Sequence, residues 1–160
     1  MRVGIVAVGR MKQGPERELV ARYLDRAIAT GKSLGLTNFA VSELTESRAG
    51  SAAARKTEEA KAIGAVLPAT GLVVALDEHG RTLGSDDFAQ RLAHWRDDGK
   101  QALSFVIGGA DGLDPAFVKA AHLTLSFSPL TWPHQLVRIM LAEQLYRATT
   151  ILSGHPYHRE

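Results

Sequence analysis

The sequence has 160 residues, of which 45% are apolar and 22% charged, as expected for one globular domain spanning residues 1–160. Its 19 basic and 17 acidic residues give a formal net charge of +2, which excludes a uniformly basic nucleic-acid coat protein but allows a local basic patch. Cysteine is absent, which excludes disulfides, thiol catalysis and Cys-ligated zinc. No segment matches a signal peptide or a membrane span, so we expect a cytoplasmic protein with no membrane partner.

Apolar, β-branched runs alternate along the chain with segments of helical periodicity. Strands are predicted at residues 2–9, 39–44, 71–77, 102–109 and 123–127. Helices are predicted at residues 15–28, in the later part of 45–69, and at 85–99, 114–121 and 133–152. This alternation predicts an α/β fold, a parallel sheet with helices on both faces.

Capping residues and one loose segment refine this prediction. Pro15 suits the first turn of the first helix, and Ser85 and Asp114 suit N-cap positions. The first helix is expected to bury an apolar face that includes Leu24 and Ile28. Residues 45–54 are rich in Ser, Ala and Gly, so we expect them to be pliable.

The last predicted helix has apolar residues on two sides. One arc holds Val137, Met140, Leu141, Leu145, Ala148 and Leu152, and the opposite arc holds Ile139, Ala142 and Tyr146. A surface helix of a monomer needs only one apolar stripe, so the second arc favours a subunit interface or burial within a larger domain.

Ligands of open parallel sheets bind beyond the carboxyl ends of the strands, which here are residues 75–80, 106–112 and 125–135. The turn "GGADG" allows close approach of backbone to a ligand, although a simple tight turn explains it equally well. It is neither a dinucleotide fingerprint nor a P-loop. The stretch "FSPLTWPHQ" is stiffened by two prolines and could hold a purine through main-chain hydrogen bonds, or could place Trp132 in the core.

The C-terminal residues are unusually polar. By default His134 is structural, Glu143 and Arg147 form a modest i, i+4 surface pair, and "HPYHRE" is a frayed, solubilising end. Zinc binding by His155 and His158 matches no standard ligand spacing, so no metal site is expected.

Five motifs together change this interpretation. The chain resembles the SPOUT-class ribosomal RNA large-subunit methyltransferase H family through "VAVGRMK", "ALDEHG", "IGGADGL", "LTWPHQLVRIMLAEQLYRA" and "HPYHRE". The resemblance covers the whole chain. It implies an α/β fold with a C-terminal trefoil knot and use of S-adenosylmethionine (S-adenosyl-L-methionine). It also implies a homodimer that methylates N3 of a pseudouridine in large-subunit (23S) ribosomal RNA within the assembled ribosome.

The resemblance assigns a cofactor site to the three strand-end loops. Leu76 lines the pocket by family pattern, and Gly108 and the adjacent Gly109 give close backbone approach. The adenosine is expected to lie against Phe127, Ser128, Pro129, Leu130, Thr131 and Trp132.

The catalytic candidates lie on the last helix and the tail. They are Glu143, Arg147, Tyr157, His158 and Arg159, with the tail expected to reach the partner's cofactor pocket if the last helix forms the dimer interface. The sequence does not assign the general base. The candidates are Glu143, Glu160, His134, His155 and His158. Candidate RNA-binding residues are Arg10, Lys12, Arg48, Arg55, Lys56 and Lys61, although such residues usually solvate a surface.

Two other functions are compatible with the residues alone. One is a non-enzymatic RNA-binding or ribosome-assembly module on the same fold. The other is a small hydrolase that uses His134 and Glu143.

Overall fold

A computed structural model describes residues 1–158 of the chain. The elements are β1 (Arg2–Val8), α1 (Pro15–Gly31), the 3-10 helix η1 (Lys32–Leu34), β2 (Thr37–Leu44), α2 (Ala52–Val66), β3 (Leu72–Arg81), α3 (Ser85–Asp97), β4 (Ala102–Ile107), α4 (Pro115–Ala120), β5 (Leu123–Leu125) and α5 (His134–Ser153). No helix in this part of the chain is long and apolar enough to cross a membrane.

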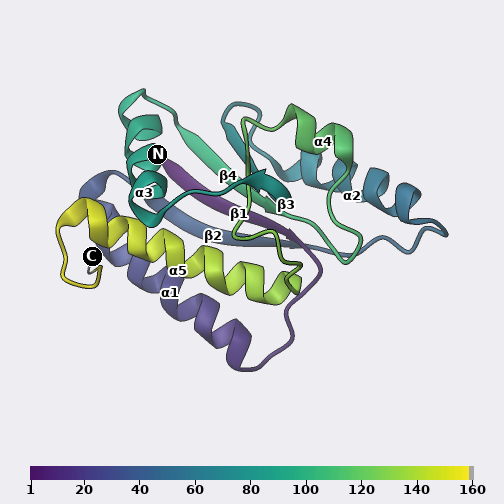
Figure 1. Cartoon of the computed structure of the whole chain (residues 1–160), viewed down its shortest axis with the longest axis horizontal. Coiled ribbons are helices and arrows are strands. Elements are labelled where there is room, and N and C mark those ends of the chain that lie inside the picture. The colour runs from purple at the N-terminus through teal and green to yellow at the C-terminus, as the bar shows by residue number, and fades with distance from the viewer. Residues whose placement is uncertain (159–160) are drawn as a thin grey trace.

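Within residues 1–158, five parallel strands form one sheet in the order β2-β1-β4-β3-β5 (Figure 1). Alternate residues of each strand face opposite sides. Ile5 and Phe105 belong to the cluster beneath α1, α3 and α5, whereas Val6 and Val106 pack with residues of α2 and α4. The predicted parallel α/β sheet with helices on both faces is therefore confirmed.

The capping predictions have different outcomes. Asp114 caps α4 as predicted, because its Oδ1 accepts hydrogen bonds from the amides of Ala116 and Phe117. The prediction for Ser85 is wrong, since Gly84 occupies the N-cap and Ser85 begins the helix. The Ser85 hydroxyl instead donates to Gln144 Oε1 at 2.9 Å, which links α3 to α5.

The predicted burial of Ile28 is also wrong. Its side chain is 43% exposed, because the buried stripe of α1 runs through Val20, Leu24, Ala27 and Gly31. Ile28 therefore lies beside the buried stripe of α1 and not within it.

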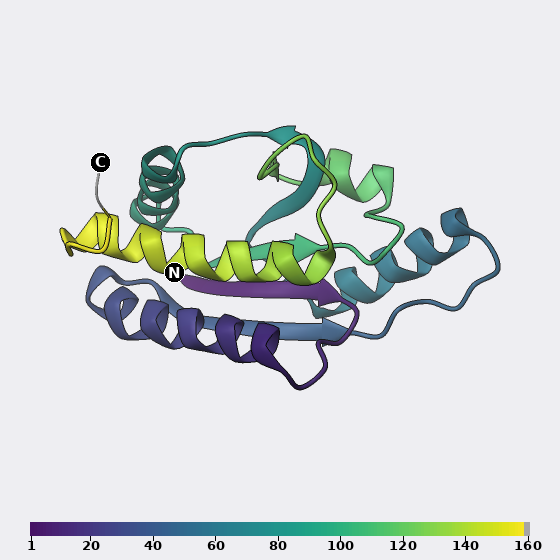
Figure 2. The same ribbon diagram turned by 60° about the horizontal axis from the view of Figure 1, so that its bottom comes forward.

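Helix α5 lies between α1 and α3 over one face of the sheet, as Figure 2 shows. Ala142 and Tyr146, from the second apolar arc, are buried inside the chain, with the Tyr146 ring 6.3 Å from that of Tyr23 on α1. The second arc is therefore covered by α1 and is not evidence for another subunit. Only Ile139 of that arc remains partly exposed.

A buried arginine anchors the start of α5 to the sheet. Arg138 is 1% exposed, and its Nη2 donates to the carbonyl oxygens of Val8 (2.9 Å) and Gly9 (2.6 Å) at the end of β1. Its Nη1 pairs with Glu43 Oε1 at 2.7 Å, and the same oxygen accepts the amide of Met11. Burial lowers the pKa of the Arg138 guanidinium, and the Glu43 carboxylate opposes that shift.

Arg138→Met should destabilise the fold strongly, because two buried carbonyls lose a charged donor and the Glu43 carboxylate loses its cationic partner. Breaking one side of a buried ion pair costs about 3–5 kcal/mol, to be measured as the free energy of unfolding in urea. The double variant Arg138→Met with Glu43→Gln should recover part of that loss, because the unpaired charge is gone. If Arg138→Met alone lowers the free energy of unfolding by less than about 1 kcal/mol, which is typical of an exposed ion pair, this role is contradicted.

Candidate active site

A cavity of about 730 Å³ opens at the carboxyl ends of β3, β4 and β5, beside the start of α5. It contains eight of the nine residues that the sequence assigned to a cofactor: Leu76, Gly108, Gly109, Phe127, Ser128, Leu130, Thr131 and Trp132. Pro129 lies in the same loop but not in the cavity wall. The fold thus brings together segments that are far apart in the sequence.

The turn after β4 requires glycine at position 108 because of its own backbone geometry. A Cβ atom at this position would lie 2.7 Å from the carbonyl carbon of Gly112 and 2.9 Å from the amide nitrogen of Leu113. Real Cβ atoms do not approach backbone so closely, so the turn itself requires glycine here. The tight-turn explanation of this glycine is therefore supported, and replacing Gly108 would disturb the turn whether or not it also allows close approach to a ligand.

The loop between β5 and α5 is held by side-chain hydrogen bonds. Ser126 Oγ donates to the carbonyl oxygen of Glu78 at 3.1 Å, which ties the loop to the end of β3. Ser128 Oγ accepts hydrogen bonds from the Leu130 amide (2.9 Å) and from the indole Nε1 of Trp132 (3.1 Å). These bonds fix the loop's shape beside the cavity.

Two large apolar side chains of this loop remain accessible. Leu130 is 66% exposed and Trp132 39% exposed, so the interpretation that placed Trp132 in the core is wrong. The Ser128 hydroxyl holds the indole at the cavity wall instead. Both side chains are available to contact a bound molecule.

Charged groups of both signs line the same cavity. Asp77, Glu78 and His79 come from the end of β3, Lys56 from α2, and His134 from the start of α5. Glu78 and His79 were not predicted as site residues from the sequence, although they stand in the motif "ALDEHG" two and three residues after Leu76. No local sequence pattern indicates that Lys56 lines the cavity, because its position there depends on how α2 packs.

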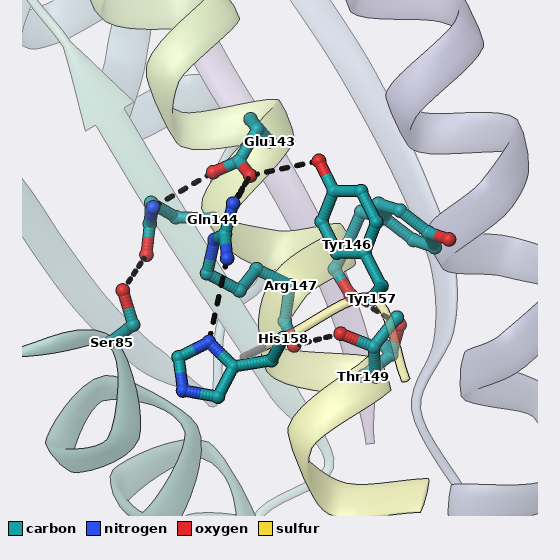
Figure 3. Close-up of polar contacts among 9 residues, drawn as sticks. Ser85, Glu143, Gln144, Tyr146, Arg147, Thr149, Tyr157 and His158 are labelled. Carbon is teal, nitrogen blue, oxygen red and sulfur yellow. Dashed lines mark hydrogen bonds and ion pairs between the residues drawn. The ribbon is translucent and has the colours of Figure 1, made fainter. Parts of the chain in front are cut away.

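The tail packs on the far half of α5 (Figure 3). The Tyr157 hydroxyl donates to Glu143 Oε1 at 3.1 Å, and Arg147 binds the same oxygen through Nε (3.0 Å) and Nη2 (2.5 Å). The Arg147 guanidinium lies 4.9 Å from the Tyr157 ring centroid, and its Nη1 is 3.4 Å from His158 Nδ1. Four of the five catalytic candidates thus form one cluster, here called the tail cluster.

This arrangement revises the default interpretations of the C-terminus. Tyr157 and His158 are half-buried, so neither belongs to a frayed end. Glu143 and Arg147 form the core of a network rather than an isolated surface pair. The fifth candidate, Arg159, lies outside the described residues.

The tail cluster and the cavity are separated along α5. His134 lines the cavity, whereas Arg147 is thirteen residues further on, roughly 20 Å along a helix. The nine-residue separation of His134 and Glu143 corresponds to roughly 13 Å, which rules out direct proton transfer between them and removes the basis of the hydrolase interpretation. Within residues 1–158, no three His, Asp or Glu side chains gather as metal ligands.

Comparison with known proteins defines the class. The family model described as "Predicted SPOUT methyltransferase" matches residues 1–158, and the chain belongs to this family. Its curated relatives include the proteins named ribosomal RNA large subunit methyltransferase H from Allorhizobium ampelinum (59% identical) and Bradyrhizobium diazoefficiens (56% identical), each over 159 residues and 99% of both chains. The resemblance drawn from the five motifs is thereby confirmed.

The tail cluster should show an alkaline titration. Burial, followed by the nearby Glu143 carboxylate, raises the pKa of Tyr157 to about 12 from its ordinary value of 10.0. Because the folded state keeps the phenolic proton, the stabilisation from Tyr157 should be complete below pH 10 and be lost as the pH rises through about 12. Tyrosinate absorbance should contain a late step that Tyr157→Phe abolishes; an unchanged titration curve in that variant would contradict the docked tail.

Proposed function

We propose that the chain is an S-adenosylmethionine-dependent methyltransferase that methylates N3 of a pseudouridine in large-subunit ribosomal RNA, in the cytoplasm and on the assembled ribosome. The observation that carries this proposal is the cavity, whose walls contain eight residues assigned to the cofactor from the motifs. Family membership and the names of the relatives support the reaction and the substrate class.

The cavity suits this cofactor in size and chemistry. Its volume lies within the range of roughly 300–1,000 Å³ that is usual for small-molecule sites. Leu130 and Trp132 offer apolar surface for an adenosine, while Asp77 and Glu78 suit the positive charges of a sulfonium and an ammonium group. A phosphate-binding motif is unnecessary, because S-adenosylmethionine has no phosphates.

Bound there, S-adenosylmethionine would supply an electrophilic methyl group. The chain's own task is to hold the pseudouridine in line with that group and to help its N3–H lose a proton. A positioned general base contributes about 10²–10⁴-fold to such a step. His134 is a titratable group in the cavity wall, whereas Tyr157, His158, Arg147 and Glu143 lie in the tail cluster further along α5.

A homodimer would bring these two sets of residues together. If a two-fold axis crosses α5, the two copies of α5 run antiparallel, and each tail comes beside the partner's cavity. A groove of about 420 Å³ between α1, α3 and α5 supports an interface here, since its lining includes the apolar side chains of Leu19, Tyr23, Phe88, Ile139 and Met140. In this arrangement Tyr157, His158 and Arg159 would act on RNA bound at the partner's cavity.

The family resemblance also leads us to propose a C-terminal trefoil knot. The close passage of the end of β3 beside β5 supports it: a Cβ on Gly80 would lie 2.7 Å from the carbonyl carbon of Leu125, and the Ser126 amide donates to the Arg81 carbonyl. The chain then returns from the sheet edge to the start of α5 near β1. A crystal structure of the protein would test the crossing directly.

Calorimetric titration with S-adenosylmethionine tests the cofactor assignment. The wild type should bind at micromolar concentration, and Leu130→Arg should weaken binding at least tenfold, or about 1.4 kcal/mol, because it puts bulk and positive charge beside a cationic ligand. Ile28→Arg, at a similarly accessible apolar residue on α1, should bind normally. A wild type that binds no S-adenosylmethionine would instead favour the non-enzymatic RNA-binding module.

A complementation assay tests the action of the tail in trans. Deletion of residues 157–160 should spare folding and dimerisation but abolish most methyl transfer to ribosomes, and Leu130→Arg should be inactive through its cavity. Mixed dimers combine a sound cavity with a sound tail from the other chain, so activity should return. Confirmed heterodimers without activity, or a wild type that sediments as a monomer at micromolar concentration, would refute the shared site.

A further inference from the structure

We propose that the loops following β1 and β2, together with the start of α2, form a preorganised surface that binds RNA phosphates beside the cavity. This surface, here called the basic rim, comprises Arg10, Lys12, Arg48 and Lys56. The inference rests on the proposed function, since it specifies how that function's substrate reaches the cavity.

The basic rim lies at the same edge of the sheet as the cavity. Arg10 and Lys12 follow β1, and Arg48 follows β2, so all three come from the carboxyl ends of parallel strands. Lys56 lines the cavity itself. The loop after β1 directly adjoins the cavity wall, because a Cβ on Gly9 would be 3.6 Å from His134 Nε2.

The charges of the basic rim are available to a partner. Among residues 1–158, none of the four side chains takes part in an ion pair, and Arg10, Lys12 and Arg48 are exposed. Arg55 differs from them, although the sequence analysis grouped it with the RNA-binding candidates. It forms a two-bond pair with Asp111 (2.6 and 3.0 Å), so its charge is already matched inside the protein.

Arg55 and Glu59 hold the loop of residues 45–51 in place. Arg55 Nη1 donates to the Ala49 carbonyl at 3.1 Å, and buried Glu59 accepts the Ser47 amide at 3.0 Å. Through Asp111, Arg55 also joins this loop to the glycine turn of the cavity. The segment expected to be pliable is therefore tied down at several points.

A fixed loop lowers the entropic cost of binding, because the backbone that carries Arg48 need not be ordered when RNA arrives. Phosphate contacts set the position and register of a nucleic acid without reading its sequence. A target base in RNA must be unstacked to enter a cavity, and backbone contacts on the rim would hold the strand while it does so. Exposed Glu46 and Glu58 are two residues from Arg48 and Lys56 in the sequence, so the surface carries charges of both signs and suits phosphates at discrete places rather than any polyanion.

The test compares two triple variants with the same loss of charge. The rim variant carries Arg10→Gln, Lys12→Gln and Arg48→Gln; Lys56 is left intact because it lines the cavity. The matched control carries Arg2→Gln, Lys32→Gln and Lys100→Gln, three exposed residues at or near the amino edge of the sheet. The probe is ribosomes from cells that lack this methyltransferase, assayed for methyl transfer over a series of salt concentrations.

For the rim variant we expect KM for ribosomes to rise about tenfold and kcat to change less than about twofold, since the lost contacts position the substrate. The dependence of log affinity on log salt should become shallower by about two, at about 0.7 for each lost contact to single-stranded RNA. The control should keep the wild-type KM and salt slope. Equal effects of both variants, or no effect of the rim variant, would overturn the proposal.

Two further measurements separate this inference from the proposed function. Affinity for S-adenosylmethionine, measured by calorimetry, should be the same in the wild type and the rim variant; a loss there would overturn the assignment of the rim to RNA. Should the wild type fail to methylate ribosomes, the proposed function would fall. Co-sedimentation with ribosomes would still decide whether the rim binds RNA: weaker binding by the rim variant than by the control supports it, and equal binding refutes it.

Discussion

The guanidinium of Arg138 determines where the last helix meets the sheet. It spans the two final carbonyls of the β1 region and the Glu43 carboxylate of β2, so α5 can start at only one place relative to those strands. The preceding loop must then run from β5 to that point, and its residues become a wall of the cavity. A buried charge is tolerated only when its hydrogen bonds are made, which gives this contact little freedom to slide.

Helix α5 also acts as a rigid spacer. Its first turn borders the cavity, and Glu143 and Arg147 of the tail cluster follow nine and thirteen residues later, roughly 13 and 20 Å along the helix. Packing between α1 and α3 holds the helix against the sheet, and the Ser85–Gln144 hydrogen bond adds a polar contact to that packing. The spatial separation of the two groups of polar residues is thus built into the secondary structure.

Local patterns in the sequence predicted those parts of the fold that depend on local physics. The β-branched runs marked the strands, Asp114 marked a helix start, and the gathering of parallel strand ends placed three distant loops at one cavity. Predictions failed where a distant partner decided the outcome. Ser85 does not cap its helix and instead bonds Gln144, 59 residues away, and Arg138 is buried by carbonyls 129 and 130 residues earlier.

Periodicity has a similar limit at α5. It reveals that Ala142 and Tyr146 share an apolar side, but it cannot say whether the chain's own α1 or a second copy covers them. The same holds for Arg55 and Lys56, which are neighbours of equal charge in the sequence. Only the packing of α2 distinguishes the residue that is bound to Asp111 from the one that faces the cavity.

The crowding at Gly108 affects what a survey of sequence variation could reveal. Because a side chain there would collide with the backbone of Gly112, selection would retain glycine for the sake of folding even if nothing bound in the cavity. Invariance at position 108 would therefore not be informative about ligand recognition. Leu130 is the opposite case: its side chain is largely exposed, so packing places little demand on it. Restricted variation at Leu130 would be a cleaner evolutionary signature of a bound molecule.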